Sequence, residues 1–596
     1  MKNVSDHIAQ YLKKRGINQI FTVTGGGAMF LNKAFHDVFG NNISYMHHEQ
    51  ACAMAAEGYA RIKNKPAVVN VTSGPGGINA LNGVFGAFTD SIPMIIISGQ
   101  VKNETLVRSY SDKNLRQLGD QEANIQNIAK PLCKYIVGIK KASELETELP
   151  KALFYSMNGR PGPVWIDIPS DIQMKQKKLN FKSFKKTKKI DDVRYKKIFL
   201  KLSKLLEKSR RPLILAGTGV RLSSTVKDLI GFSKKFGIPI ATAWTHDLIE
   251  SDSKYFAGRP GTIGTRPGNF CLQNSDIVIV LGSRLNIRQT GFNFSGFAKN
   301  AKLVHVDIDS SELNKFYLNS FMKINLDLKD FFSYAFKYLE SSRKKQYEEW
   351  VHWCKKINTE YSIKKEKFVK DKKGYLNPYK ALFQISDMLK EGDKIVCGNA
   401  SACIIPFQSI AIKRNQRLFS NSGSASMGYD LPAALGAAIA DKRNKNSRII
   451  CFAGDGSLQM NIQELQTLRS LNLNVKIFLM NNNGYLSIKS THKNFFGTVF
   501  GSHPKSGIDF PNFVKVSKAY SINTYKISTY RALKKLTNIL EKKEPALIEL
   551  MINTEQEFCP KLKSRMDKNG NFITPELDDM FPFLPKQDLV NIKESL

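Results

Sequence analysis

The sequence lacks any apolar run that could cross a lipid bilayer. Its longest such run, Ile92–Ser98, has the length of a β-strand, whereas a membrane-spanning helix needs about 20 apolar residues. The N-terminal residues MKNVSDHIAQYLKKRG have the pattern of an amphipathic helix, which differs from that of a secretory signal peptide. We therefore expect a soluble cytoplasmic protein without a membrane partner.

Paired cysteines are absent and acidic residues are few. The eight cysteines include no Cys-x-x-Cys pair, so we expect buried free thiols in a reducing compartment. Asp and Glu number 52 against 89 Lys and Arg, a formal charge of +37 that can indicate a nucleic-acid or membrane surface or an anionic substrate. The lysines are spread along the chain, however, and no zinc-finger or RNA-binding motif accompanies them. We expect a solvated basic surface and no nucleic-acid partner.

A chain of 596 residues is too long for one hydrophobic core, because domains usually contain about 100–200 residues. Three segments alternate short apolar runs with helical patterns, which is typical of parallel α/β layers. The prediction is an α/β protein with three parallel-sheet, Rossmann-like domains at 1–172, 190–335 and 375–552, joined by a basic linker (174–189) and a charged connector (336–374), with a tail at 553–596. The expected strands include Ile43–Met46, Ala67–Thr72, Met94–Ser98, Val164–Ile168, Pro212–Ala216, Ile277–Leu281, Leu303–Ile308, Lys394–Cys397, Arg448–Ala453, Val475–Met480 and Ala546–Met551.

Two glycine-containing turns each follow an apolar strand in the third segment. They are Gly454–Ser457 (GDGS) and Asn481–Gly484 (NNNG), with a helical pattern at Leu458–Leu473 between them. This order places both turns at the carboxyl edges of neighbouring parallel strands, where α/β sheets bind ligands. The Asp455 carboxylate and the Asn482 amide oxygen can there bind one Mg²⁺ ion, which prefers oxygen ligands and usually shares them with a phosphate. Ordinary turns are the alternative.

Glu49 is a candidate catalytic residue. It follows the expected strand Ile43–Met46 and opens a helix rich in Ala and Gly, HHEQACAMAAEGYAR, which neighbouring elements can approach closely. A glutamate at this place can simply stabilise the helix N-terminus. The alternative is chemical, because a carboxylate in an apolar place forms a strong hydrogen bond to a cofactor ring.

Several motifs together resemble the acetolactate synthases and related enzymes that use thiamine diphosphate (ThDP). The GDG and NN motifs have the spacing of that family, with Asp455 and Asn482 27 residues apart. The other matching pieces are Glu49, 55–61, 72–79, 92–100, 160–171 and 421–434. The similarity covers about residues 1–552. It implies a cofactor bound at an interface between two subunits, and hence a homodimer or homotetramer.

The resemblance also implies a role for each matching residue. Glu49 would hydrogen-bond the aminopyrimidine ring of ThDP and so promote loss of the C2 proton. Mg²⁺ would be held by Asp455, Asn482 and the main-chain carbonyl of Gly484. Met427 would lie under the cofactor and bring its two rings together, with plain core packing as the alternative. The other implied cofactor contacts are Gly398, Asn399, Ala400, Gly454, Gly456, Ser457 and Tyr485.

The second segment resembles the part of acetolactate synthases that holds FAD outside any redox step. The matching positions are Arg160, Gly217, Gly219, Gly261–Gly264, Arg284, Arg288, Asp307 and Ile308. Arg160, Arg284 and Asp307 are the side chains that we expect to contact FAD. Some relatives use this domain for ADP or only as structure, so a structural domain is the alternative.

The resemblance implies a decarboxylase or carboligase that acts on a 2-oxo acid, usually pyruvate, and passes a two-carbon unit to a carbonyl acceptor. The alternatives are a true acetolactate synthase, a non-ligating decarboxylase or lyase, and a catalytically silent binding subunit. Intact Glu49, Asp455 and Asn482 argue against the silent subunit.

The acceptor end of the site departs from the family. Ser487 and Thr491 stand where acetolactate synthases carry a methionine and a tryptophan, and Asp120 replaces a phenylalanine. Such a roomier, more polar pocket fits a hydroxylated acceptor, such as the nucleotide-linked keto sugar used by similar enzymes of surface-polysaccharide synthesis. Gln121 is retained and is a second candidate catalytic residue. His48, Lys489 and His492 are further candidates near the reacting groups, with purely structural roles as the alternative.

Overall fold

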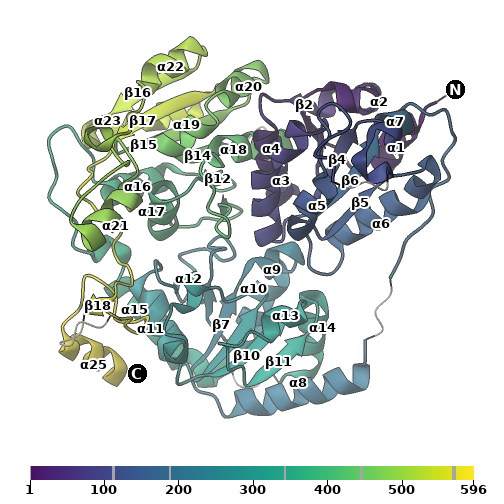
Figure 1. Ribbon diagram of the computed structural model, residues 1–596. Coiled ribbons are helices and arrows are strands. Elements are labelled where there is room, and N and C mark those ends of the chain that lie inside the picture. Colours follow the sequence, from purple (N-terminus) through teal and green to yellow (C-terminus); the bar gives the residue numbers. More distant parts are fainter. Residues whose placement is uncertain are drawn as a thin grey trace.

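Three all-parallel β-sheets with flanking helices form most of the protein, as the computed structural model shows (Figure 1). A two-stranded antiparallel sheet, β18 Arg565–Met566 with β19 Phe572–Ile573, lies in the tail. The structure describes residues 2–110, 114–186, 190–340, 344–442, 444, 447–566 and 572–596. The predicted α/β class with parallel sheets is confirmed. Residues 187–189 of the predicted basic linker lie outside the described residues.

The first sheet has the strand order β2-β1-β3-β4-β6-β5. Its central strand β4 is buried along its whole length, which explains the uninterrupted apolar sequence, because helices cover both faces of a parallel sheet. The strands are β1 Ile20–Thr22, β2 Ile43–Tyr45, β3 Val68–Val71, β4 Met94–Gln100, β5 Tyr135–Gly138 and β6 Pro163–Pro169. The helices are α1 Val4–Lys14, α2 Met29–Phe39, α3 Glu49–Lys63, α4 Pro75–Thr89, α5 Ile125–Ala129, α6 Leu145–Met157 and α7 Ser170–Gln173.

The second sheet has the order β11-β10-β9-β7-β8. The strands expected at Pro212–Ala216 and Ile277–Leu281 have the same bounds in the structure and are fully buried. The strands are β7 Pro212–Ala216, β8 Ile240–Thr242, β9 Ile277–Leu281, β10 Lys302–Asp307 and β11 Met322–Asn325. The helices are α8 Asp192–Glu207, α9 Thr218–Leu222, α10 Val226–Phe236, α11 Arg266–Gln273, α12 Ile287–Thr290, α13 Ser310–Leu313 and α14 Leu328–Tyr338.

The third sheet has the order β13-β12-β14-β15-β17-β16. Its strands are β12 Lys394–Cys397, β13 Arg417–Phe419, β14 Ile449–Gly454, β15 Val475–Asn481, β16 Asn523–Ile527 and β17 Ala546–Met551. Its helices are α16 Pro378–Met388, α17 Ser401–Ser409, α18 Asp430–Asp441, α19 Asp455–Met460, α20 Glu464–Ser470, α21 Leu486–Phe496, α22 Phe513–Ala519, α23 Tyr530–Leu533 and α24 Leu536–Glu541. The single helix expected at Leu458–Leu473 is wrong. The chain breaks it at Asn461, which is buried and donates its amide to the carbonyl of Gly428 (2.8 Å).

Helices α3 and α18 join the first and third sheets. A Cβ at Gly58 would lie 2.2 Å from the carbonyl oxygen of Ala433, so only glycine permits this close packing. Beside it, Arg61 forms ion pairs with Glu57 (2.7 Å) and Asp90 (2.6 Å), with all three side chains nearly buried. The two sheets therefore share one core.

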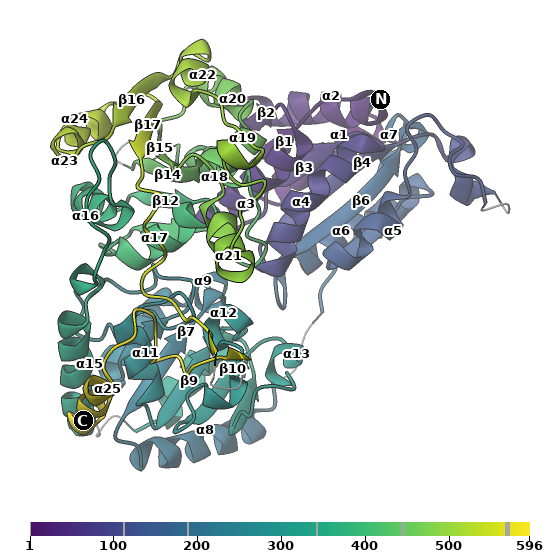
Figure 2. The ribbon, with the colours of Figure 1, turned by 60° about the vertical axis from the view of Figure 1, so that its left-hand side comes forward.

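The tail after residue 553, which the sequence pattern left undecided, runs down onto the second sheet's domain (Figure 2). It ends in α25 (Lys586–Glu594), beside α15 (Glu348–Glu360). Asn269 of α11 donates to the carbonyl of Leu577 (2.8 Å), and Arg266 donates to the carbonyl of Met580 (3.1 Å). Buried side chains thus fix the tail to the central domain.

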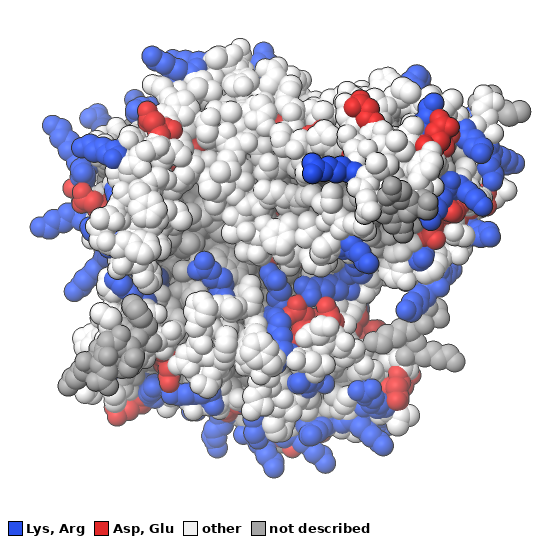
Figure 3. Space-filling view, viewed as in Figure 1, with Lys and Arg blue, Asp and Glu red and all other residues white. Residues whose placement is uncertain are grey.

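The surface is basic without one dominant patch on the face in Figure 3, where Lys and Arg stand around the whole outline among fewer acidic side chains. All eight cysteines are free thiols, and seven of them are buried as expected, whereas Cys133 is partly exposed. Within the described part of the chain, no helix is both long enough and apolar enough to span a membrane.

Candidate functional site

Asp455 and Asn482 lie together at the carboxyl edge of the third sheet, at the ends of the neighbouring strands β14 and β15. Asp455 is only 2% exposed. Its Oδ1 accepts a hydrogen bond from the Gly456 amide (2.8 Å), and its Oδ2 accepts one from the Gly484 amide (3.0 Å). The second bond joins the GDG and NN turns directly. Burial raises the pKa of Asp455 to about 6, although backbone N–H groups oppose this effect.

The donor set of this pair of turns fits a hard cation. Asn482 is buried, and its Oδ1 has no hydrogen-bond donor among the described residues. A buried acceptor without a donor costs about 1–3 kcal/mol, which a metal ion would remove. A cation beside Asp455 would also stabilise its charged form. The carboxylate, the amide oxygen and the nearby main chain of Gly484 are the oxygen ligands that Mg²⁺ prefers.

Glycines make room beside these ligands. Gly484 has φ +149°, and a Cβ there would lie 2.1 Å from the carbonyl oxygen of Ser502. A Cβ at Gly456 would lie 2.1 Å from the ring of Tyr485, and one at Gly398 would lie 2.6 Å from Oδ2 of Asp430. Backbone N–H groups at such turns can approach a phosphate closely.

The remaining expected cofactor contacts lie around these turns of Gly398, Gly454–Ser457 and Asn481–Gly484, which together we call the cradle. Ser457 accepts a hydrogen bond from the Gly428 amide through its Oγ (2.8 Å), which places the half-buried Met427 next to the GDG turn. Ala400 has φ +46° and precedes α17, which begins at the carboxyl end of β12, and the Asn399 amide lies 3.5 Å from the carbonyl oxygen of Ala425. The structure thus brings Gly398–Ala400, Met427, Gly454–Ser457, Asn482, Gly484 and Tyr485 to one edge of the sheet.

Glu49 lies at the first residue of α3, directly after β2, and is 9% exposed. Its Oε2 accepts a hydrogen bond from the Asn79 side-chain amide of α4 (3.1 Å). Its Oε1 lies against Gly76, where a Cβ would come within 3.4 Å. The helix cap itself is His48, which accepts from the Gln50 amide (3.0 Å). Because His48 performs the capping, Glu49 remains available for another contact.

Gln121 lies near the same end of α4. A Cβ at Gly74, the residue before α4, would lie 2.3 Å from the Gln121 carbonyl oxygen. Gln121 has φ +60° and is exposed, as is Asp120. Within the described residues, no hydrogen bond or ion pair joins Glu49 or Gln121 to Asp455 or Asn482. The half-sites are therefore not assembled by direct bonds within one chain.

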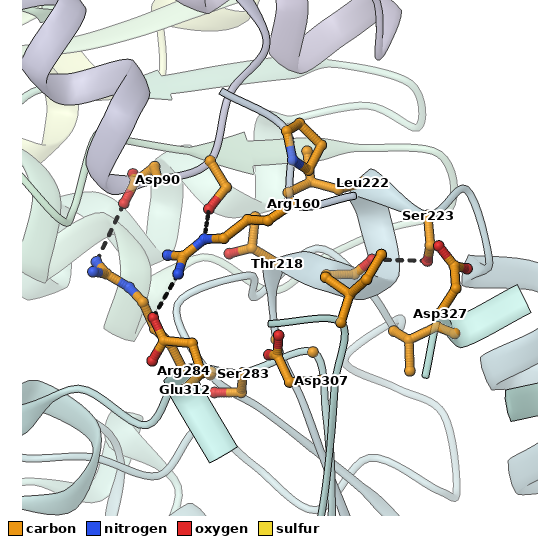
Figure 4. A pocket seen from close by; sticks show the side chains of 18 of the residues that line it. Asp90, Arg160, Thr218, Leu222, Ser223, Ser283, Arg284, Asp307, Glu312 and Asp327 are labelled. Carbon is orange, nitrogen blue, oxygen red and sulfur yellow. Dashed lines mark hydrogen bonds and ion pairs between the residues drawn. The ribbon is translucent and has the colours of Figure 1, made fainter. Parts of the chain in front are cut away.

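A cavity of about 370 Å³ lies between the first and second sheets' domains, at the carboxyl ends of β7, β9 and β10 (Figure 4). Arg160 reaches into it and donates to Ser91 (2.8 Å) and Glu312 (2.7 Å). Arg284 lies 3.5 Å from Asp90. These partners, Glu312 and Asp90, were missed by sequence reasoning, because nothing local marks a carboxylate that meets an arginine from a distant segment.

Asp307 also lines this cavity, at the end of β10. Burial raises the pKa of Asp307 to about 6, and its Oδ1 accepts from the Asp309 amide (2.9 Å). Gly217 and Gly219 lie in its wall, whereas Gly261–Gly264 and Arg288 do not. A Cβ at Gly264 would lie 2.1 Å from the carbonyl of Arg259, so this glycine serves a tight turn. The cavity thus collects all three expected FAD-contacting side chains.

Helix α21 follows the Asn481–Gly484 turn and carries Ser487 and Thr491, two of the positions expected to differ from the family. Thr491 donates its hydroxyl to the carbonyl of Ser487 (3.0 Å), and no residue of α21 is buried. His492 stacks on Phe500 with ring centroids 3.8 Å apart. Ser490 also donates to Glu557 (3.3 Å), so contacts in the middle of α21 connect it to the rest of the chain.

The sequence is similar to those of known proteins over nearly its whole length. The family profiles described as the N-terminal TPP binding domain, the central domain and the C-terminal TPP binding domain of thiamine pyrophosphate enzymes match residues 2–123, 200–333 and 398–550. The chain is 30% identical to the acetolactate synthase large subunit of Buchnera aphidicola subsp. Schizaphis graminum, over 98% of this chain and 96% of the relative. It is 29% identical to that of Lactococcus lactis, over 97% of each chain. It is 28% identical to acetolactate synthase 1, chloroplastic, of Zea mays, over 94% and 87%. The chain therefore belongs to the thiamine pyrophosphate enzymes of the acetolactate synthase large-subunit family.

Proposed function

We propose that this enzyme is a ThDP- and Mg²⁺-dependent carboligase that transfers a two-carbon unit from a 2-oxo acid, usually pyruvate, to a carbonyl acceptor. The observation that carries the proposal is that the GDG and NN turns are joined by a hydrogen bond. Asp455 bonds the Gly484 amide (3.0 Å), while Asn482 Oδ1 is left without a donor. Buried acceptors in ordinary turns normally receive a hydrogen bond, so an unpaired buried oxygen where the two turns meet points to a ligand.

The residues of the proposed site would have different roles. When bound, ThDP supplies the electron sink for decarboxylation and transfer. Asp455, Asn482 and the Gly484 carbonyl would hold the Mg²⁺ ion. Glu49 would share a proton with a ring nitrogen of the cofactor's aminopyrimidine through Oε1, because Asn79 already occupies and orients Oε2. Gln121 would lie on the substrate side of the same end of α4.

We also propose that the active unit is a homodimer or a homotetramer with the site between two copies. Helix α4 exposes Ile78, Phe85 and Phe88, which lie on one helical face. Contiguous exposed apolar side chains are typical of interfaces. This face adjoins Asn79, the partner of Glu49, so a second copy could bring its Asp455 cradle to Glu49. A cytoplasmic location is part of the same proposal and is supported by eight free thiols.

We propose further that the cavity lined by Arg160, Arg284 and Asp307 binds FAD or a similar adenine nucleotide. It lies at the carboxyl ends of parallel strands, where such sheets bind nucleotides. Co-purification of a yellow, flavin-absorbing protein is the expected result. Colourless protein that takes up no added FAD would leave this domain with a structural role.

For the acceptor, we propose a hydroxylated carbonyl compound, such as a nucleotide-linked keto sugar. The support is the short, polar side chains of Ser487 and Thr491 on the exposed α21, and the exposed Asp120. The second candidate is a true acetolactate synthase, which the similarity to large subunits of that enzyme favours.

The deciding experiment incubates the purified protein with ThDP, Mg²⁺ and pyruvate, with and without candidate keto-sugar nucleotides. Products are identified by mass. A two-carbon adduct of the sugar is expected, and acetolactate as the sole product would favour the ordinary synthase. No consumption of pyruvate in any mixture would contradict a pyruvate-dependent carboligase.

A further inference from the structure

A second cavity, of about 550 Å³, lies at the carboxyl ends of β15 and β17. Its walls come from 481–484, 486, 489, 502–505, 551–554, Lys372 and Tyr375. It shares residues 482–484 with the metal motif, but none of Gly398, Asp455 and Ser457 lines it. The cavity therefore adjoins the Asn482 turn but is not lined by those three residues of the proposed diphosphate cradle.

The side chains around this cavity are basic. Lys372, Lys489, Lys505 and His503 line it, and no Asp or Glu is among its lining residues. Lys372 forms an exposed pair with Glu555 (3.2 Å). In the part of the chain that the structure describes, Lys489 and Lys505 form no ion pair with a carboxylate. The cavity therefore has a local excess of positive charge, which favours an anion.

Two buried polar atoms in the wall have no partner among the described residues. They are Nδ2 of Asn553 and Oγ of Ser502, whose residues are 1% and 0% exposed. The Oδ1 of Asn553 accepts from the Glu555 amide (3.0 Å), which fixes the side chain with its amide donor free. A buried donor without an acceptor costs about 1–3 kcal/mol. Because both residues line the cavity, a ligand rich in acceptor oxygens would satisfy them.

We propose that this cavity binds a phosphate or diphosphate group, with Lys489 and Lys505 as its cations and Asn553 and Ser502 as its neutral donors. Lysine is a common point-charge ligand of phosphate, and a phosphate group has several oxygens that can accept from the two neutral donors. The inference rests on the proposed function in one respect, which is the placement of the cofactor's own diphosphate at Asp455. The phosphate group can come from a nucleotide-linked acceptor or from free inorganic phosphate.

Its position suits an acceptor. Lys489 lies on α21, between Ser487 and Thr491, the two residues that depart from the synthase pattern. The same short helix therefore carries the proposed phosphate ligand and the proposed acceptor wall. An acceptor anchored by its diphosphate in the cavity would approach the site along this helix.

The test is isothermal titration of the full-length protein, saturated with ThDP and Mg²⁺, with inorganic phosphate and separately with a nucleoside diphosphate. Saturable binding is expected. Lys505→Glu and the double variant Lys489→Ala/Lys505→Ala should each weaken binding by about 10-fold or more, the loss of a charge-assisted hydrogen bond. Lys505 is exposed, so Lys505→Glu should fold normally. Lys493→Ala is the matched control, because Lys493 lies one turn along α21, is exposed and does not line the cavity.

The outcomes separate the two proposals. Tighter binding of the nucleoside diphosphate than of phosphate, sensitive to Lys505→Glu, would assign the site to the acceptor, and equal binding would assign it to free phosphate. Phosphate that binds only without ThDP would lie in the cofactor's cradle and would overturn the inference, as would unchanged affinity in the lysine variants. Failure of the proposed function appears differently, as wild-type protein that consumes no pyruvate while its phosphate titration is unaffected.

Discussion

The proposed metal cradle of the third sheet and the cavity of the second sheet are built by different means. The cradle is closed by backbone groups, and its joining bond from Gly484 to Asp455 links residues 29 apart. The cavity is framed by ion pairs, and its bond from Arg160 to Glu312 links residues 152 apart. A short motif therefore encodes the cradle, whereas the cavity depends on contacts that only the folded chain brings together.

The largest effect should come from Glu49→Gln, which tests whether the cradle can support turnover without this carboxylate. Glutamine keeps the size and can still accept from Asn79, but it cannot stabilise a proton shift on the cofactor ring. We expect turnover to fall by about 10²–10⁴-fold, with ThDP affinity within a few-fold of wild type. Pyruvate consumption and ThDP titration measure the two quantities.

The control for this variant is Glu104→Gln, which alters an exposed glutamate that pairs with Lys102 (3.7 Å). It should leave both quantities unchanged. Near-normal turnover of Glu49→Gln would show that the cradle binds and activates the cofactor without this carboxylate.

Asp455→Ala breaks the cradle itself. It removes the proposed metal ligand and the acceptor of the Gly456 and Gly484 amides. Loss of a second-shell partner alone typically costs 10–100-fold in metal affinity, so we expect Mg²⁺-dependent ThDP affinity to fall by about 100-fold or more. Flavin retention should not change, because Asp455 does not line the central cavity. Equal losses of both cofactors would mean general unfolding, and unchanged ThDP affinity would show that the metal site is elsewhere.

Arg160→Ala alters the central cavity and leaves the cradle intact. It leaves Glu312 and Asp309 without their common cation in the cavity wall. We expect flavin affinity to fall by about 10-fold, the usual value of a partly exposed charge-assisted contact, while ThDP affinity is retained. Arg210→Ala, at an exposed arginine outside the cavity, is the matched control. Full flavin retention in Arg160→Ala would remove this arginine from the proposed site.

The same contrast explains what the sequence could predict. The apolar strands and the GDG and NN turns are local patterns, so β9 and β14–β15 were found within one residue of their ends. The three-residue strands β1 and β8 were not among the expected strands, whereas β2, of the same length, was expected because it directly precedes the Glu49 motif. The helix break at Asn461 was missed because a distant carbonyl, that of Gly428, causes it.

Candidate site residues follow the same rule. Asn482 was identified from its motif, but its lack of a donor is visible only in the fold. Glu312 and Asp90 stand in no motif, and only the meeting of two domains places them beside Arg160 and Arg284. The sequence therefore predicts site residues that belong to one local turn. It does not predict those that meet only when two domains pack together.

The smallest effect should come from Ala400→Gly, which tests backbone strain in the cradle. Ala400 has φ +46° and ψ −122°, a conformation that residues with a Cβ rarely adopt. Glycine should relieve about 1–3 kcal/mol of backbone strain. Its greater freedom in the unfolded chain costs about 0.5–1 kcal/mol. The free energy of unfolding should therefore rise by about 1 kcal/mol. Ala402→Gly, two residues on and inside α17, should lower it by about the same amount or more. Thermal unfolding of the two variants under one set of conditions should therefore give midpoint shifts of opposite sign, and shifts of the same sign would show that the loop before α17 carries no strain.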